Sequence, residues 1–143
     1  LLYATPELSR DVHISGTPRL TIRVAANAAA ANLSVWLVAL PFDPTPPGRA
    51  TSIITRGWAD PRNHRSVRQS EPLVPGEFVT LTFELQPDDQ VIPAGRRIAL
   101  MIMSSDREFT LLPPPGTELT VDLGGTFLTL PVVGGEAAIG GGR

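Results

Sequence analysis

Hydrophobic and polar residues alternate along much of this chain with the period of two that β-strands show. The alternation is strict over residues 20–24 and 78–85, so we predict two strands that each bury one face. Shorter runs of the same kind occur at 12–14, 51–54, 109–112, 118–123 and 126–133. The pattern therefore predicts a protein built mainly from short strands.

Two runs are apolar on both alternating faces, residues 33–40 and 98–103. Such runs are typical of strands that are covered on both sides, although periodicity alone leaves a buried helical segment open for 98–103. A turn should precede the second run, because Pro93 fixes its own φ and Gly95 can take a positive φ. We expect both runs to be central strands.

The breaks between these runs are of uneven length. Three prolines make residues 41–48 an irregular loop, and residues 58–72 are polar and arginine-rich, which predicts a long loop. A hairpin turn is expected at Gly124 and Gly125. The alanine-rich stretch 25–31 is either a short helix or a loop.

About eight or nine strands with such uneven connections favour an all-β fold, a two-sheet jelly-roll β-sandwich, over an up-and-down barrel. We expect one sandwich domain over residues 1–135 and a flexible glycine-rich tail over 136–143.

Composition narrows the function classes. With 143 residues, 42% hydrophobic and 18% charged, the chain can form one real core. A net charge of −2 gives no electrostatic argument for nucleic acid or an anionic membrane, and no apolar run is long enough to span a bilayer. All 12 basic residues are arginine, which we interpret as a trace of a GC-rich, bacterial source. The compartment, cytoplasmic or secreted, and homo-oligomerisation stay open.

The residues offer little catalytic chemistry. The sequence has no G-x-S-x-G elbow, no phosphate-binding loop and no cysteine. His13 and His64 have no triad or metal-ligand spacing, and the aspartates form no known calcium loop. We therefore predict no catalytic residue, no cofactor and no metal site, and we expect this chain to be a fragment of a longer protein.

One group of polar residues still suggests binding. Arg56, Arg62, Arg65 and Arg68 surround Trp58, and guanidinium groups can pair with carboxylates or stack on rings. The group forms either an interface or a solvated loop. With Phe42 of the proline-rich loop, these are the candidate interface or pocket-wall residues: Phe42, Arg56, Trp58, Arg62, Arg65 and Arg68.

Nearly the whole chain, to about residue 135, resembles the C-terminal domain of X-Pro dipeptidyl-peptidases and of the related cocaine-esterase-type and acylase-type α/β-hydrolases. The segments that carry the resemblance are Leu2, Tyr3 and Thr5 with Leu8 and Asp11; Ile14-Ser15-Gly16-Thr17-Pro18; Leu37-Val38-Ala39-Leu40 leading to Pro47-Gly48-Arg49; Thr55-Arg56-Gly57-Trp58; Pro75-Gly76; and Ile92-Pro93-Ala94-Gly95-Arg96-Arg97-Ile98 through Met103-Ser104-Ser105-Asp106. At position 96 the family often has histidine, whereas this chain has Arg96, so no histidine role is carried over.

The resemblance implies a galactose-binding-like jelly roll that follows a hydrolase domain carrying a Ser-Asp-His triad. The partner of the sandwich would be the α/β-hydrolase domain of the same parent chain. The parent would be a serine peptidase, and the sandwich would help to shape its substrate pocket. No catalytic residue is then expected here. The alternative is a carbohydrate-binding module of the same fold, for which Trp58 would be the stacking residue.

Overall fold

Strands make up almost all the regular structure of the computed structural model, which describes residues 1–42 and 52–139. The strands are β1 (Leu2–Ala4), β2 (Val12–Gly16), β3 (Arg19–Ala26), β4 (Leu33–Leu40), β5 (Ile53–Ala59), β6 (Val79–Glu84), β7 (Asp88–Ile92), β8 (Arg97–Met103) and β9 (Leu119–Thr129). Two single-turn helices accompany them, the 3₁₀ helix η1 (Pro61–Asn63) and α1 (Glu136–Ile139). The expected all-β class is confirmed.

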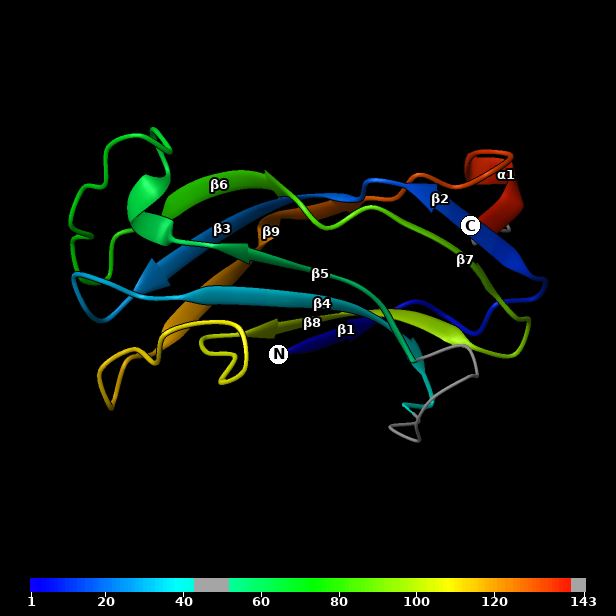
Figure 1. Ribbon diagram of the computed structural model, residues 1–143, viewed down its shortest axis with the longest axis horizontal. Helices are drawn as coiled ribbons and strands as arrows, with labels where there is room; N and C mark the ends of the chain where they lie inside the picture. Colours follow the sequence, from blue (N-terminus) through cyan, green and yellow to red (C-terminus); the bar gives the residue numbers. More distant parts are fainter. Residues whose placement is uncertain (43–51, 140–143) are drawn as a thin grey trace.

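The strands form two facing layers, as Figure 1 shows. One layer is a four-stranded antiparallel sheet in the order β1-β8-β4-β5. The other is the three-stranded sheet β6-β3-β9, and the β2-β7 pair lies at one end of the sandwich. A bridge from Ile14 to Val132 joins β2 to the chain beyond β9.

The core lies between the layers, because one face of each sheet is apolar. Leu33, Val35 and Leu37 are fully buried on one face of β4, and Leu20 and Ile22 are fully buried on β3. Complete burial of side chains of this size stabilises the fold by roughly 1.5–3 kcal/mol each. The two doubly apolar runs form β4 and β8, and both have a strand on either side, as predicted.

The predicted hairpin at Gly124 and Gly125 is wrong, since both glycines lie inside the continuous strand β9. Both halves of β9 pair with β3, and the register shifts between Thr21 and Arg23. The extra residues form a bulge, in which the backbone N–H of Arg23 donates to Oγ1 of Thr126 (3.2 Å). A Cβ on Gly125 would lie 2.9 Å from the Arg23 side chain, so the close approach requires glycine.

For residues 25–31 the sequence left a short helix or a loop open, and the loop is correct: β3 continues to Ala26, and bends without helix or strand follow before β4. Two further predictions need correction. The strand expected from residue 51 up to Gly57 is β5, which spans Ile53–Ala59, so the arginine-rich loop begins later than the predicted residue 58; residue 51 lies outside the described residues. The predicted strand at 109–112 is a turn and bend, because Thr110 bonds back to Asp106 (N to O, 2.8 Å).

The turn before β8 forms as predicted. Gly95 has a φ of +79°, which only glycine adopts without strain, and its N–H donates to the carbonyl oxygen of Leu8 (2.8 Å). At the other end of the chain, Ile139 of α1 packs against the core, and residues 140–143 of the expected flexible tail lie outside the described residues. Neither helix found in residues 1–42 and 52–139 has the length and hydropathy to cross a membrane.

Candidate functional site

The outer face of the four-stranded sheet carries one continuous row of large side chains. Leu2 pairs with Met101, Met101 pairs with Trp36, and Trp36 pairs with Arg56. Directly paired residues of antiparallel strands point to the same face, so the four side chains form one line across β1, β8, β4 and β5. We call this line the Trp36 row. It is apolar until it ends in the cation of Arg56.

Arg56 contacts two aromatic rings. Its Cζ is 4.7 Å from the ring centre of Trp36 and 5.2 Å from that of Phe109. Trp58 lies next to Phe109, with ring centres 5.4 Å apart and planes tilted by 36°. Each cation–π contact of this kind contributes about 0.5–2 kcal/mol. We call these four residues the Arg56 cluster.

A buried carboxylate holds the Arg56 cluster in place. Asp106 is 7% exposed, and its Oδ2 accepts from Oγ of Ser34 (3.1 Å) and from Nε1 of Trp36 (2.9 Å). Its backbone carbonyl accepts from the N–H groups of Phe109 (3.0 Å) and Thr110 (2.8 Å). Asp106 therefore orients the indole that contacts Arg56 and also closes the turn that carries Phe109.

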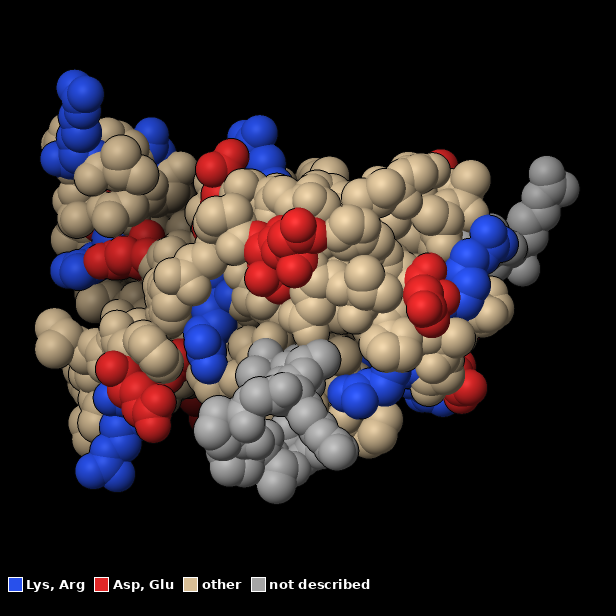
Figure 2. All heavy atoms as spheres, turned by 45° about the vertical axis from the view of Figure 1, so that its right-hand side comes forward, with Lys and Arg blue, Asp and Glu red and all other residues tan. Residues whose placement is uncertain are grey.

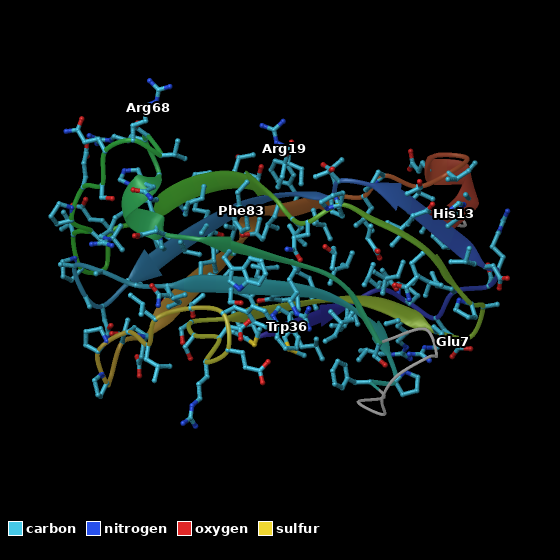
Figure 3. All side chains as sticks on the ribbon, in the orientation of Figure 1. Glu7, His13, Arg19, Trp36, Arg68 and Phe83 are labelled. Carbon is cyan, nitrogen blue, oxygen red and sulfur yellow. The ribbon has the colours of Figure 1, made fainter. Side chains whose placement is uncertain are left out.

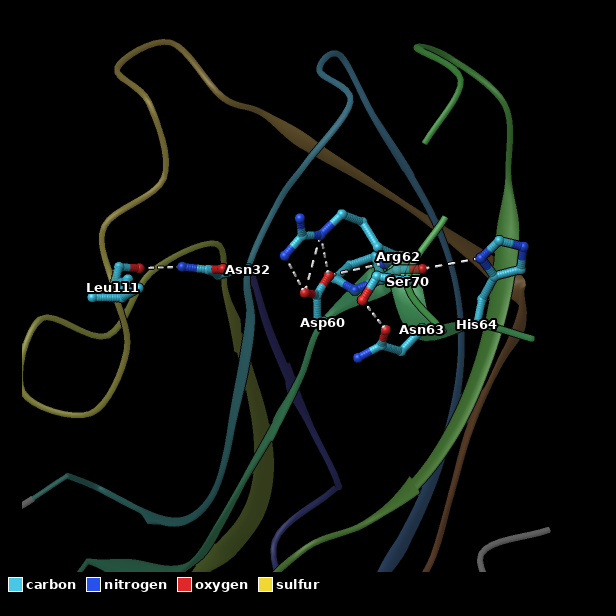
Figure 4. A network of polar contacts seen from close by, with 8 residues as sticks. Asn32, Asp60, Arg62, Asn63, His64, Ser70 and Leu111 are labelled. Carbon is cyan, nitrogen blue, oxygen red and sulfur yellow. Dashed lines mark hydrogen bonds and ion pairs between the residues drawn. The ribbon is translucent and has the colours of Figure 1, made fainter. Parts of the chain in front are cut away.

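The arginine-rich loop follows β5 and has its own polar network (Figure 4). Asp60 caps η1 by accepting from the backbone N–H of Arg62 (2.9 Å), and it also forms a two-pronged ion pair with the guanidinium of Arg62 (2.6 and 3.1 Å). Burial alone would raise the pKa of Asp60. The hydrogen bonds and charge of Arg62 outweigh burial, so this pKa lies below its usual value of 3.8.

The other predicted interface residues are spread along the sheet. Arg65 pairs with Glu71 (3.1 Å) at the same end as Arg62, and Arg68 extends outward there (Figure 3). Phe42 is 39% exposed and follows Leu40, at the opposite end of β4 from Trp58. The structure thus brings Arg56 and Trp58 together, places the three loop arginines near one end, and separates Phe42 from them.

A second apolar feature lies where the two layers meet at β1 and β9. Here the sandwich has a cleft of about 430 Å³, lined by the core residues Leu37, Ile98 and Leu100. Leu123 and Phe127 of β9 also line it, and they are 58% and 61% exposed. Both flanking strands are sheet edges. The cleft therefore lies between two edge strands, with buried core residues on its floor and exposed apolar side chains of β9 at its rim.

Charge is spread thinly over the surface. Figure 2 shows a face on which acidic and basic side chains are interspersed among larger uncharged areas. His13 pairs with Asp89 across β2 and β7, and Nδ1 of His64 lies 3.1 Å from the carbonyl oxygen of Pro61. Within residues 1–42 and 52–139, no group of three or more His, Asp or Glu side chains is arranged to hold a metal ion.

Two residues of the site, Asp106 and Phe109, are not among the residues predicted to bind. Phe109 lies in the segment 109–112, for which a strand is predicted. Arg96 lies outside the site, where its Nη2 donates to the carbonyl oxygens of Ala39 (3.0 Å) and Pro41 (2.8 Å). Asp106 has a sequence signal, because an acidic residue three positions after a buried strand can fold back to accept from neighbouring strands. Phe109 has none, since only the turn orients it.

Comparison with known families agrees with this architecture. Residues 1–139 match the model of the X-Pro dipeptidyl-peptidase C-terminal non-catalytic domain. The chain belongs to this family. The resemblance seen in the sequence is confirmed.

Relatives of the family resemble the chain over most of its length. A Rhodopirellula baltica protein, provisionally named Xaa-Pro dipeptidyl-peptidase, is 60% identical over 136 residues, which are 94% of this chain and 22% of the relative. A Xaa-Pro dipeptidyl-peptidase of Lactobacillus delbrueckii subsp. lactis is 32% identical over 159 aligned residues, covering 91% of this chain and 20% of the relative. The chain thus spans about a fifth of the length of these relatives.

Solved structures show the same fold at low sequence identity. An α-amino acid ester hydrolase matches 93% of this chain and 25% of its own, with a TM-score of 0.73 and 16% identity. A CocE/NonD family hydrolase from Staphylococcus aureus matches 93% of this chain and 30% of its own, with a TM-score of 0.69 and 14% identity. These matches bear on the fold alone.

Proposed function

We propose that this domain packs against the α/β-hydrolase domain of a serine hydrolase of X-Pro dipeptidyl-peptidase type and helps to shape its substrate pocket. The cleft between β1 and β9 carries the proposal. Leu123 and Phe127 are more than half exposed there, beside the buried core residues Leu37, Ile98 and Leu100. Apolar surface of this kind is typical of contact with another protein surface.

The extent of the relatives supports the same partner. The chain spans about a fifth of their length, so most of such a protein lies outside the sandwich. The catalytic triad would lie in that larger part, with acyl transfer from substrate to serine as the reaction. The sandwich would supply shape and contact surface.

The pocket-shaping role would fall to one end of the four-stranded sheet. Trp58 and Arg56 lie in the Arg56 cluster, and the loop with Arg62, Arg65 and Arg68 follows directly after β5. Phe42 would make a separate contact, because it lies at the other end of β4. A carbohydrate-binding role is less favoured, since Trp58 packs on Phe109 and its Nε1 is buried.

The test uses the full-length enzyme with Phe127→Asp and a matched Val91→Asp control. Val91 is also about half exposed (48%), but it lies on β7, away from the cleft. We expect F127D to speed proteolytic cleavage between the domains and to raise KM for an Ala-Pro-linked chromogenic substrate, because a buried aspartate opposes docking. V91D should change neither quantity.

Two results would contradict the proposal. One is an F127D enzyme that behaves like V91D in both cleavage rate and KM. The other is hydrolysis of the chromogenic substrate by the isolated chain at the full-length rate, which would place the catalytic groups in the sandwich.

A further inference from the structure

Arg56 is a cation that contacts two aromatic rings and has no ion-pair partner among the described residues. Trp36 covers one side of its guanidinium at 4.7 Å and Phe109 lies at 5.2 Å. Within residues 1–42 and 52–139, no carboxylate oxygen lies within 4.0 Å of it, whereas Arg23, Arg62 and Arg65 each have an acidic partner. The neighbouring carboxylate of Asp106 bonds to Ser34 and Trp36 instead.

This environment determines what Arg56 can bind. Nε is buried and has no hydrogen-bond partner among the described residues, so an incoming acceptor must approach the terminal Nη atoms. The two ring contacts shield part of the guanidinium from water and restrict its motion. The planar guanidinium favours a planar acceptor with two oxygens. A carboxylate has this shape and supplies the missing negative charge.

The surroundings indicate a protein carboxylate rather than a small free anion. The Trp36 row leads to Arg56 through Leu2 and Met101, and Leu2 (50%) and Phe109 (51%) are half exposed. An apolar surface with a central Trp and Arg has the composition of binding hot spots in protein interfaces. A free anion would contact the cation and leave the row uncovered.

We infer that Arg56 binds an Asp or Glu carboxylate on the catalytic part of the same parent chain, and that the Trp36 row packs against the apolar surface around that carboxylate. The inference rests on the proposed function. The catalytic part is the expected partner because about four-fifths of the relatives' length lies outside the region that matches this chain. The ion pair would fix the orientation of the sandwich on the catalytic part.

The absence of lysine from the chain allows a direct test. Arg56→Lys places a single side-chain amine at the site, and Arg19→Lys is the control, since Arg19 is exposed and points away from the other layer (Figure 3). A carbodiimide joins an amine to a neighbouring carboxyl group as an amide, with loss of water to the reagent. In the full-length enzyme, we expect R56K to form an amide with one Asp or Glu outside residues 1–143. Mass spectrometry should find this product roughly tenfold above R19K.

A second pair of variants separates the ion pair from simple stacking. We expect R56Q to raise the rate of proteolytic cleavage between the domains about tenfold over R19Q at low salt, which corresponds to about 1.4 kcal/mol. The difference should shrink in 1 M salt, because salt screens charge pairs and leaves ring packing intact. The cleavage rate of R56K should fall between the rates of R56Q and of the parent enzyme.

The outcomes distinguish this inference from the proposed function. Amide formation only with carboxyl groups of this chain, or equal cross-linking in R56K and R19K, overturns the inference. Equal cleavage rates for R56Q and R19Q overturn it as well. If F127D still speeds proteolytic cleavage between the domains in that case, the packing proposal stands without the ion pair. If none of these variants has an effect, both fail.

Discussion

Nε1 of Trp36 donates a 2.9 Å hydrogen bond to Oδ2 of Asp106, a residue 70 positions later in the chain. The bond connects the middle of β4 to the turn that follows β8. The same carboxylate oxygen accepts from Ser34, whose side chain is fully buried. One acidic residue thus sets the orientation of the indole and the start of the turn that carries Phe109.

Asp106→Ala should destabilise the protein by about 3 kcal/mol, because two donors lose their acceptor in a buried site. Asp106→Asn keeps one acceptor oxygen and should cost less. Urea unfolding followed by tryptophan fluorescence measures both. The control is Asp89→Ala, since the side chain of Asp89 is 73% exposed. Equal unfolding free energies for D106A and D89A would contradict the structural role.

Arg96 and Arg97 are adjacent in sequence but should respond differently to truncation. Nη2 of Arg96 donates to two backbone carbonyls and lies 3.4 Å from Oγ of Ser52, whereas Arg97 is exposed. Charged hydrogen bonds contribute about 1.5–3 kcal/mol. We expect R96A to lower the free energy of unfolding by roughly this amount, and R97A to change it by less than about 0.5 kcal/mol. Urea titrations of R96A and R97A under the same conditions measure the two free energies of unfolding. Similar urea midpoints for the two variants would contradict the prediction.

Gly57 should tolerate no side chain. A Cβ there would lie 3.0 Å from Cγ of Leu85 and 3.2 Å from its Cα, so the facing strand would have to shift. Overpacking of this kind costs about 1–3 kcal/mol, which G57A should show as a lower melting temperature. The control is G124A, for which the nearest atom is 3.5 Å away. A G57A melting temperature equal to that of G124A would mean that β5 and Leu85 do not pack so closely.

Acid should weaken the Asp60–Arg62 pair. The folded pKa of Asp60 lies below its usual value, so its contribution to stability is complete above about pH 4 and is lost as pH falls through the folded pKa. Asp60→Asn should therefore lower the urea midpoint at pH 7, and the gap from the parent protein should close as the pH falls below 4. Glu84→Gln, an exposed residue on β6, should show no such gap. A difference in urea midpoint between D60N and the parent protein that stays constant with pH would contradict the lowered pKa of Asp60.

The two strands at the centre of the four-stranded sheet could be predicted because their signal is local. Residues 33–40 and 98–103 are apolar on both faces, which is typical of a strand whose two faces are both covered, and such strands lie inside a sheet, as β4 and β8 do. Gly124 and Gly125 show the limit of such signals. A glycine pair favours a hairpin turn, yet here it forms a bulge, because both halves of β9 pair with β3. Only that long-range pairing distinguishes the two outcomes.

The candidate site was predicted in part. Arg56 and Trp58 were identified from their composition, since arginine and tryptophan in one segment suggest binding. The same composition grouped Phe42 with them, but Phe42 lies at the far end of β4. Composition carries no information on distance across a sheet. The place of Phe109 in the Arg56 cluster depends on a turn that hydrogen bonds to Asp106 close.

By itself, the sequence determined the all-β class, the central strands, the turn at Gly95 and the family, because periodicity, backbone preferences and motif order are properties of neighbouring residues. The tertiary structure decided which side chains share a face. Leu2, Met101, Trp36 and Arg56 form one row only because the register of three strand pairs aligns them. Register results from many hydrogen bonds and packing contacts formed together, so no short segment of the chain specifies it.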